Sequence, residues 1–312
     1  MDTWAVVLER PERLALRQLD LPDPVDQDVV VRVEWSGIST GTERLLWEGR
    51  MPDFPGMGYP LVPGYESVGR VEFAGPQSGR VEGERVFVPG ARCFGSVRGL
   101  FGGAASRVVV PGSRVHPVDD ALDERAVLLA LAATARHALE VAGRAPELIV
   151  GHGVLGRLLA RLAVGIYGAA PVVWETDPQR ATGALGYGVV DPRDDARRDY
   201  RCAIDASGDS RILDALMTRL AKGGQIVLAG FYAEPLAFQF APAFMREAAI
   251  RVAAEWQPAD LQAVRDAVTR GALSLDGLVT HRRLPSAAAE AYRDAFADRS
   301  CLKMVLDWRS PA

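Results

Sequence analysis

The hydrophobic positions of the chain follow two different periods, and the change lies near residue 120. Before it, short runs of alternating or β-branched residues are separated by Gly, Pro and Asp, which is typical of a β-rich domain. The clearest predicted strands are 29–35, 68–73, 85–88 and 107–110. Between them, 49–64 (Gly- and Pro-rich) and 90–103 (Gly-rich) are predicted as long loops, which in compact domains often bind ligands.

Beyond residue 123, hydrophobic residues recur at helical spacing, and predicted helices then alternate with short buried strands. Residues 124–141 are predicted as helical, with two helices meeting near Leu131. The strands that follow are 148–150, 172–174, 203–204 and 226–229, and the helices between them are 155–167, 179–185 and 211–221. This alternation predicts a parallel sheet with helices on its faces. The last predicted elements are helices 259–269 and 286–297 and strand 301–308.

Composition narrows the class of protein. With 48% hydrophobic and 24% charged residues, the chain of 312 residues resembles an ordinary globular protein of two domains, and its net charge of −4 argues against a nucleic-acid partner. The cysteines Cys93, Cys202 and Cys301 are scattered, which favours a reducing cytoplasm and excludes a four-cysteine zinc site. No apolar run reaches the roughly 18 residues of a membrane span. The only lysines are Lys222 and Lys303.

A glycine motif of the form GxGxxG lies between a predicted strand and a predicted helix. In this context Gly151 permits a tight turn, Gly153 lets the backbone approach a pyrophosphate, and Gly156 allows the helix to pack closely on the strand. The N–H groups that begin the helix, at Val154 and Leu155, are then free to bind phosphate. The motif therefore predicts a dinucleotide site.

Glu175 ends the next predicted strand and supplies the acidic residue that accompanies such a motif. Its carboxylate can accept hydrogen bonds from both ribose hydroxyls and would repel a 2′-phosphate, so the sequence favours NAD over NADP. The other interpretation is that the glycines are turn residues and Glu175 caps a helix. His152, inside the motif, is expected to point away from the phosphates.

Small residues follow two further predicted strands of this sheet. The first strand leads into Ser207 and Gly208, and the second leads into Gly230 and Phe231. Because the carboxyl ends of parallel strands meet at one edge of the sheet, we expect these residues to line the cofactor cleft. Taken singly, each segment would be an ordinary turn.

These parts, in this order, resemble the medium-chain dehydrogenases/reductases. The resemblance rests on segments 36–43, 63–71, 83–87 and 102–106 together with the glycine motif, and it covers essentially the whole chain. It implies an α/β chain with a GroES-like β-rich substrate domain (1–121 and 280–312) and a shortened Rossmann doubly wound parallel sheet (122–279). It also implies that Thr134 packs beside the nicotinamide, and that two copies form a homodimer through edge strands, for which 251–254 is the candidate.

The chain departs from this family at the metal sites. Zinc-dependent members carry Cys in the first segment and Gly-His-Glu in the second, where this chain has Ser39 and Tyr65. Catalytic zinc needs three protein ligands, of which only Glu66 remains. The loop that corresponds to the family's four-cysteine lobe holds only Cys93. The sequence therefore predicts a zinc-free enzyme. Residues 188–202 are also too few for the helix that the family usually has there.

Without zinc, a side chain or water must accept the hydroxyl proton of an alcohol substrate. We expect Thr42, Glu43, Tyr65 and Glu66 to form the polar cluster that does this. Thr42 is the expected relay, Glu43 or Glu66 the base or its orienter, and Tyr65 the hydrogen-bond partner of the substrate oxygen. The alternative is that Glu66 pairs with an arginine and Tyr65 only packs.

Segment 34–69 resembles most closely those members of the family that act on a bacteriochlorophyllide. That resemblance implies NAD-dependent oxidation of a hydroxyethyl group to an acetyl group on a large, flat pigment. Such a ligand needs a wide apolar pocket. Aromatic residues in or beside the two long loops are candidates to line it, although they are equally typical of core anchors: Trp47, Phe54, Tyr59, Phe94 and Phe101.

Two other functions remain open at the level of sequence. One is a zinc-free quinone or enone reductase, against which Glu175 weighs because such relatives usually favour NADPH. The other is a nucleotide-binding redox sensor without catalytic activity. Cofactor binding followed by turnover distinguishes these functions from a dehydrogenase.

Overall fold

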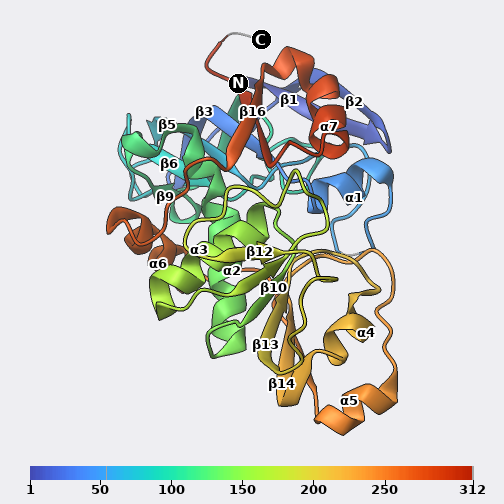
Figure 1. Cartoon of the computed structure of the whole chain (residues 1–312). Helices are drawn as coiled ribbons and strands as arrows, with labels where there is room; N and C mark the ends of the chain where they lie inside the picture. Colours follow the sequence, from blue (N-terminus) through green and yellow to red (C-terminus); the bar gives the residue numbers. More distant parts are fainter. Residues whose placement is uncertain (54, 311–312) are drawn as a thin grey trace. The chain divides into compact units, whose positions relative to one another are not determined.

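The computed structural model describes residues 1–53 and 55–310 and forms two compact units (Figure 1). Unit 1 comprises Met1–Leu129 and Leu278–Ala312, and unit 2 comprises Ala130–Gly277. The α/β fold class expected from the sequence is confirmed. The chain passes from unit 1 to unit 2 after Leu129, whereas the sequence predicted this boundary after residue 121. The boundary is later because the 3₁₀ segment η2 (Asp120–Leu128) packs on strands of unit 1.

The larger sheet of unit 1 is organised around β3 (Asp28–Ile38), which pairs antiparallel with strands from both ends of the chain. The strand order is β16-β17-β3-β5-β6-β9, and β8 also pairs with β3. The other members of this sheet are β5 (Ser67–Ala74), β6 (Arg85–Val88), β8 (Arg107–Pro111), β9 (His116–Pro117), β16 (Val279–Arg283) and β17 (Lys303–Asp307).

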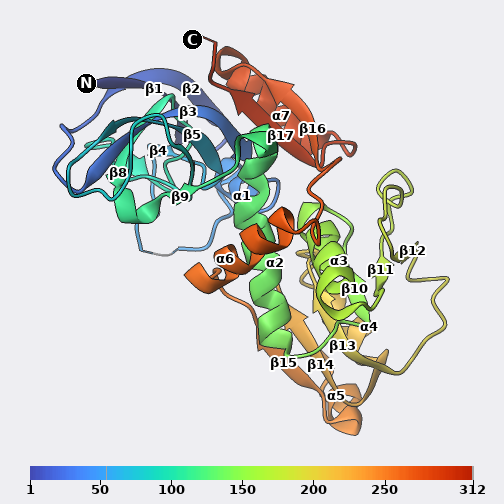
Figure 2. The same ribbon diagram turned by 90° about the vertical axis from the view of Figure 1, so that its left-hand side faces the viewer.

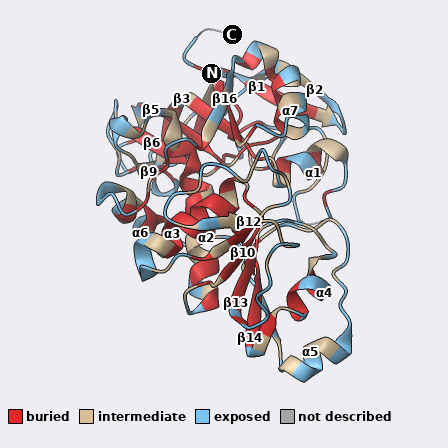
Figure 3. Cartoon of the chain, viewed as in Figure 1, coloured by how far each residue is buried: buried red, intermediate tan, exposed pale blue. Residues whose placement is uncertain are grey.

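A smaller sheet completes the β-rich part of unit 1, in the order β2-β1-β4-β7. Its strands are β1 (Asp2–Arg10), β2 (Arg13–Asp20), β4 (Leu61–Val62) and β7 (Arg98–Gly99). The valines of β3, β5 and β8 meet the inner side of β1 in one hydrophobic core, which is coloured as buried in Figure 3. β-Branched residues fit this arrangement because they pack well on a pleated surface.

Two helices of unit 1 carry residues of the candidate site. The sequence did not predict α1 (Thr42–Glu48), which ends at Gly49 with a φ of 68°, a conformation that glycine adopts without strain. Helix α7 (Ala288–Ala297) follows the 3₁₀ segment η3 (Pro285–Ala287), and η1 (Gly112–Arg114) links β8 to β9. Buried residues at helical spacing on α7, including Ala288 and Tyr292, face the core of unit 1.

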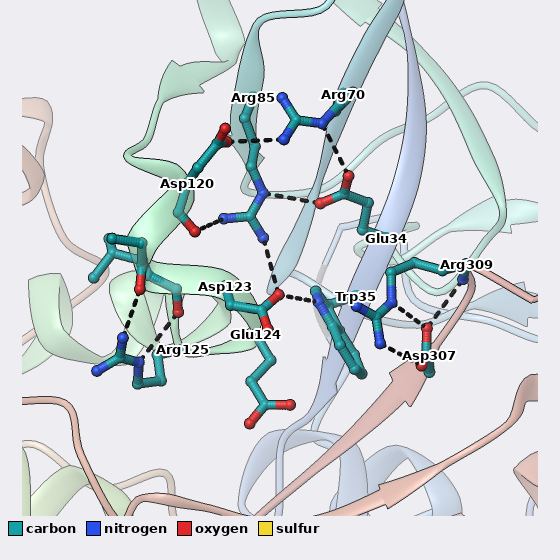
Figure 4. Close-up of polar contacts among 12 residues, drawn as sticks. Glu34, Trp35, Arg70, Arg85, Asp120, Asp123, Glu124, Arg125, Asp307 and Arg309 are labelled. Atoms are coloured by element: carbon teal, nitrogen blue, oxygen red, sulfur yellow. Dashed lines mark hydrogen bonds and ion pairs between the residues drawn. The ribbon is translucent and has the colours of Figure 1, made fainter.

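Charged side chains hold η2 against the larger sheet (Figure 4). Arg85 of β6 is buried; it donates to the Glu34 carboxylate of β3 at 2.8 Å and to the Asp120 carbonyl of η2 at 3.5 Å. The indole N–H of Trp35 donates to Asp123 at 2.9 Å, and Asp123 has a φ of 42°. These contacts fix the segment that leads into the next helix, α2 (Leu129–Ala142). The expected junction of two helices near Leu131 is therefore the step from η2 to α2 at Leu129.

Unit 2 is a parallel sheet of six strands in the order β12-β11-β10-β13-β14-β15 (Figure 1). Its strands are β10 (Leu148–Val150), β11 (Val172–Trp174), β12 (Gly188–Val190), β13 (Tyr200–Asp205), β14 (Leu220–Leu228) and β15 (Ala249–Val252). The helices after α2 are α3 (Val154–Tyr167), α4 (Ile212–Met217), α5 (Phe240–Arg246) and α6 (Pro258–Thr269). This is the doubly wound order, whose direction reverses between β10 and β13.

The expected helix 179–185 does not form, and that prediction is wrong. Figure 2 shows a loop between β11 and β12. Gly183 and Gly186 both have a φ of 79°, which no helix accommodates. The expected helix 211–221 is also shorter, because β14 already begins at Leu220. Residues 191–199 contain no helix, as the short spacing predicted.

None of the helices in residues 1–53 and 55–310 combines the length and hydrophobicity needed to cross a lipid bilayer.

Candidate active site

A buried ion pair lies at one end of β3. Strand β17 pairs with that end on one side and β5 on the other, so Lys303 and Glu66 meet there although they are far apart in the sequence. The Lys303 ammonium lies 2.7 and 2.9 Å from the two carboxylate oxygens and 3.3 Å from the Ile38 carbonyl. Lys303 is 1% exposed and Glu66 0%. The alternative raised by the sequence was that Glu66 pairs with an arginine. Glu66 does form an ion pair, but its partner is a lysine.

The carboxylate of Glu66 occupies space that a glycine leaves open. A Cβ atom on Gly37 would lie 2.3 Å from Glu66 Oε2, which is closer than any real contact. The Gly37 N–H also donates to the Glu66 carbonyl at 2.8 Å. Burial raises the pKa of Glu66, and the Lys303 charge opposes this rise. A fixed negative charge at this point therefore depends on Lys303.

Glu43 is the second buried carboxyl of unit 1, and it lies in the first turn of α1. Its two oxygens accept hydrogen bonds from the Ser39 N–H at 3.3 Å and from the Tyr292 hydroxyl at 2.8 Å. The side chain is 1% exposed. Burial, with the nearby Glu66 charge, raises its pKa from 4.5 to about 8. Glu43 therefore holds a proton at neutral pH and releases it in mildly alkaline solution.

Tyr65 joins this cluster through its hydroxyl, which donates to Ser39 Oγ at 2.5 Å and is also hydrogen-bonded to Thr42. Burial and the Glu66 charge raise the pKa of Tyr65, so its phenol stays neutral. The ring packs edge-on against Phe101, with centroids 5.1 Å apart. Tyr65 therefore has a polar contact and a packing contact at once.

The structure brings Thr42, Glu43 and Tyr65 together, while Glu66 lies with Lys303. Sequence reasoning missed Ser39 as a partner, Lys303 and Tyr292. Lys303 carried a signal in retrospect, because it is one of only two lysines in the chain. In residues 1–53 and 55–310, no group of three or more His, Cys, Asp or Glu side chains is arranged to hold a metal ion.

Most of the aromatic residues expected at a substrate pocket serve as anchors of unit 1. Trp47 packs on Tyr292 and on another ring of α7, and Phe94 is 4% exposed within the core. The hydroxyl of Tyr59 donates to a backbone carbonyl of α1 at 2.5 Å. Phe101, against Tyr65, is half-buried. Phe54 lies outside the described residues.

The glycine motif of unit 2 is tightly packed at Gly151 and Gly156 and open at Gly153. A Cβ on Gly156 would lie 1.8 Å from the Gly151 carbonyl, and Gly151 itself has a φ of 93°. By contrast, a Cβ on Gly153 would meet no atom within 4 Å. The open space thus lies at the glycine where α3 begins, and the first N–H groups of a helix have no partner within it. These residues fit a dinucleotide cofactor.

Glu175 lies just beyond β11, and backbone N–H groups orient its carboxylate. One oxygen accepts from Thr176 and Asp177 at 2.8 and 2.9 Å, and the other accepts from His152 at 3.1 Å. The acidic residue therefore lies beside the glycine motif, as the ribose contact of such a site requires.

The ends of β13 and β14 meet around the buried carboxylate of Asp205. One of its oxygens accepts from both the N–H and the hydroxyl of Ser207, and the other accepts from the Tyr232 hydroxyl. A Cβ on Gly230 would lie 3.1 Å from the Gly208 N. Ser207, Gly208, Gly230 and the exposed Phe231 therefore lie at one edge of the sheet.

Thr134, on α2, is the remaining residue expected at the cofactor. Its hydroxyl donates to the Ala130 carbonyl one turn earlier at 3.1 Å. The side chain is half-buried, so this contact leaves part of it accessible.

Known proteins resemble this chain over part of unit 1 and also over its whole length. Residues 25–120 match the family model of the alcohol dehydrogenase GroES-like domain. The chain is 57% identical to the 2-desacetyl-2-hydroxyethyl bacteriochlorophyllide A dehydrogenase of Cereibacter sphaeroides, and the match covers all of both chains. It is also 57% identical to the protein of that name from Rhodobacter capsulatus, over 99% of each chain.

Among solved structures, an alcohol dehydrogenase of Escherichia coli CFT073 in complex with NADH superposes with a TM-score of 0.83. That match covers 98% of this chain and 99% of the other, at 21% identity. At this level of identity the match establishes the fold.

Replacing Lys303 by Met should strongly destabilise the protein, because it leaves the Glu66 charge buried without a partner. Breaking such a pair costs about 3–5 kcal/mol, measured as the free energy of unfolding in urea. Adding Glu66→Gln should restore part of this loss. Lys222→Met, which removes a 73% exposed side chain, is the control and should have little effect. Equal stability of the Lys303→Met and Lys222→Met variants would contradict the role assigned to the pair.

Proposed function

The chain belongs to the medium-chain dehydrogenase/reductase family and is an alcohol-type oxidoreductase with a nicotinamide cofactor, and on this premise we propose that it oxidises the hydroxyethyl side chain of a bacteriochlorophyllide to an acetyl group, with NAD and without zinc. The observation that supports this substrate is the 57% identity, over the whole chain, to two dehydrogenases named for that pigment. Their names place the hydroxyethyl group at ring position 2, and we number the same carbon as position 3.

The residues of unit 2 support NAD as the cofactor. When bound, NAD accepts a hydride from the carbinol carbon of the substrate. The open space at Gly153 and the free N–H groups of Val154 and Leu155 would hold the pyrophosphate. Glu175, whose carboxylate is already oriented by backbone N–H groups, would accept hydrogen bonds from the ribose hydroxyls and repel a 2′-phosphate.

The buried cluster of unit 1 supports a proton acceptor made from side chains. As the hydride leaves, the hydroxyl proton of the substrate must go to a base. Tyr65 and Ser39 share a hydrogen bond of 2.5 Å, with Thr42 beside them, and can pass this proton along their hydroxyls. We assign Glu43 as the final acceptor, because a pKa of about 8 suits a base in mildly alkaline solution. Its carboxylate accepts from the Ser39 N–H, so the last transfer requires the Ser39 or Thr42 hydroxyl to turn toward that carboxylate.

Glu66 has a different role in this proposal from the one expected from sequence. Lys303 binds both of its oxygens and the side chain is fully buried, so a proton on Glu66 would have to break this ion pair. Its charge instead raises the pKa of Glu43, the residue that accepts the proton. Glu66 is therefore a positioning residue.

The donor set of unit 1 does not fit the zinc of other family members. Ser39 and Tyr65, which stand where the zinc ligands Cys and His are expected, are hydrogen-bonded to each other. The proposed substrate also reduces the need for a metal, because the carbinol carbon is attached to a conjugated macrocycle. That ring can share the positive charge that develops as the hydride leaves.

A second copy of the chain is the proposed partner of strand β15. This strand is the edge of the unit 2 sheet and pairs only with β14 among the described strands. Val252 is 72% exposed, and Phe240 and Phe244 of the preceding helix are also exposed. An apolar edge strand of this kind pairs readily with an identical edge.

The substrate is tested by mixing the protein with NAD and 3-hydroxyethyl bacteriochlorophyllide a and following the absorption of the pigment. We expect conversion to the 3-acetyl pigment together with NADH formation, and much slower conversion with NADP. A folded protein that binds NAD but leaves the pigment unchanged would rule out this substrate and favour a nucleotide sensor.

The pH dependence of pigment oxidation tests Glu43 as the acceptor. Because the ionised form accepts the proton, kcat/KM should rise with pH and level off above about 8. Glu43→Gln should abolish this rise and lower the rate by roughly 10²–10⁴-fold.

Glu48→Gln, on the same helix, is the matched control and should keep the wild-type profile, because that carboxylate is paired at the surface. An unaltered profile in Glu43→Gln would remove Glu43 from the chemistry. Likewise, a Tyr65→Phe variant with wild-type turnover would show that Tyr65 takes no part in the chemistry.

The partner of β15 is tested by measuring molar mass in solution. The wild type should be a dimer, and Val252→Lys should be a monomer because a charge then lies in the paired edge. Val81→Lys, at a similarly exposed valine of unit 1, should remain a dimer. A monomeric wild type, or a dimeric Val252→Lys variant, would refute the assignment.

A further inference from the structure

The loop that follows Glu175 lacks the helix normal for this fold, so its backbone carbonyl groups need other donors. Arg157 of α3, which is buried, supplies them. Its guanidinium donates to the carbonyls of Arg180, Thr182 and Gly183 at 2.9, 2.8 and 3.2 Å. A fourth bond, of 3.0 Å, goes to the carbonyl of His152 in the glycine motif. Side chains therefore replace the helix as the support of this loop.

His152 continues this support from inside the glycine motif. Its side chain is fully buried. Nδ1 lies 2.6 Å from the Arg180 carbonyl, and Nε2 lies 2.8 Å from the Tyr187 hydroxyl. Because a carbonyl only accepts, Nδ1 carries the hydrogen, and Nε2 accepts from Tyr187. Burial lowers the pKa of His152 to about 4, so the ring stays neutral.

The same residue also contacts Glu175, the proposed ribose acceptor. The His152 N–H donates to Glu175 Oε2 at 3.1 Å, while the His152 ring holds both ends of the loop beyond Glu175, at Arg180 and Tyr187. Tyr187 is bound in turn by Arg161, whose guanidinium also donates to the carbonyls of Ser274 and Asp276. His152 thus contacts Glu175 directly through its backbone N–H, and its ring holds Arg180 and Tyr187 of the loop that Glu175 begins.

We propose that His152 and Tyr187 are positioning residues for the adenosine ribose, and that they set the affinity of unit 2 for the cofactor without touching it. The inference rests on the proposed function, because it takes Glu175 as the ribose acceptor. It goes beyond that function by assigning a role to a histidine inside the glycine motif and to a tyrosine in the loop. Loss of their mutual hydrogen bond leaves Glu175 in place only part of the time.

The test measures binding of NAD and of ADP-ribose, which lacks the nicotinamide, to the full chain in the absence of pigment. Tyr187→Phe keeps the ring and removes the hydroxyl. We expect the Kd for both ligands to rise about five- to tenfold, by the same factor. His152→Asn, which retains a donor near the Nδ1 position and loses the acceptor for Tyr187, should show the same rise.

The double variant with His152→Asn and Tyr187→Phe should bind no more weakly than either single variant, because both remove one interaction. His152→Gln, whose amide reaches the Nε2 position, should retain more affinity than His152→Asn. Tyr200→Phe is the matched control. It removes another buried hydroxyl bond of unit 2, of 2.7 Å to Asp195, and should lower stability without changing either Kd.

Unchanged Kd values in Tyr187→Phe, with a wild type that binds NAD, would overturn this inference and leave the proposed function intact. A loss of NAD affinity without a matching loss for ADP-ribose would overturn it as well, because the effect would then not lie at the adenosine ribose. A wild type that binds neither ligand would overturn the proposed cofactor and the inference together.

Discussion

The ion pair of Glu66 and Lys303 is the interaction on which the candidate site depends, because both charges lie where water does not reach. Leaving either charge alone in that environment costs several kcal/mol. The pair ties β17 to the residue that precedes β5, across the end of β3, and Gly37 leaves the space for the carboxylate. Lys303 also opposes the rise that burial causes in the pKa of Glu66, and the Glu66 charge in turn helps to raise the pKa of Glu43. The ion pair of Glu66 and Lys303 therefore contributes both to the stability of unit 1 and to the proposed chemistry.

Unit 2 uses buried polar side chains for a related purpose. Where a helix would satisfy its own backbone, Arg157 and His152 bind the carbonyls of a loop instead. Such a network is stable only when each group has a partner, and here the histidine tautomer, the tyrosine hydroxyl and the arginine donors are mutually consistent. A shorter chain can thus retain the cofactor-side geometry of a doubly wound sheet.

The sequence predicted those helices and strands whose hydrophobic residues recur regularly, and those motifs whose residues are close together in the chain. Strands such as β6, the helix after the glycine motif and the missing helix before β13 were all predictable, since they depend on neighbouring residues. The helix expected at 179–185 was wrong because left-handed glycines and a side chain from α3 outweigh its weak propensity. Phe94, expected at a substrate pocket, lies in the core of unit 1, because a Gly-rich loop needs an anchor as much as a ligand does.

By itself, the sequence determined the two-part α/β architecture, the glycine motif with its acidic residue and the departure from the zinc ligands, because each is a matter of residue type and spacing along the chain. Only the tertiary structure decided which groups Glu66, Glu43 and His152 contact. Their partners are Lys303, Tyr292 and Tyr187, brought to them by strand order and loop path. A buried charge or hydroxyl takes its properties from the groups that replace water around it, and those groups are distant in sequence.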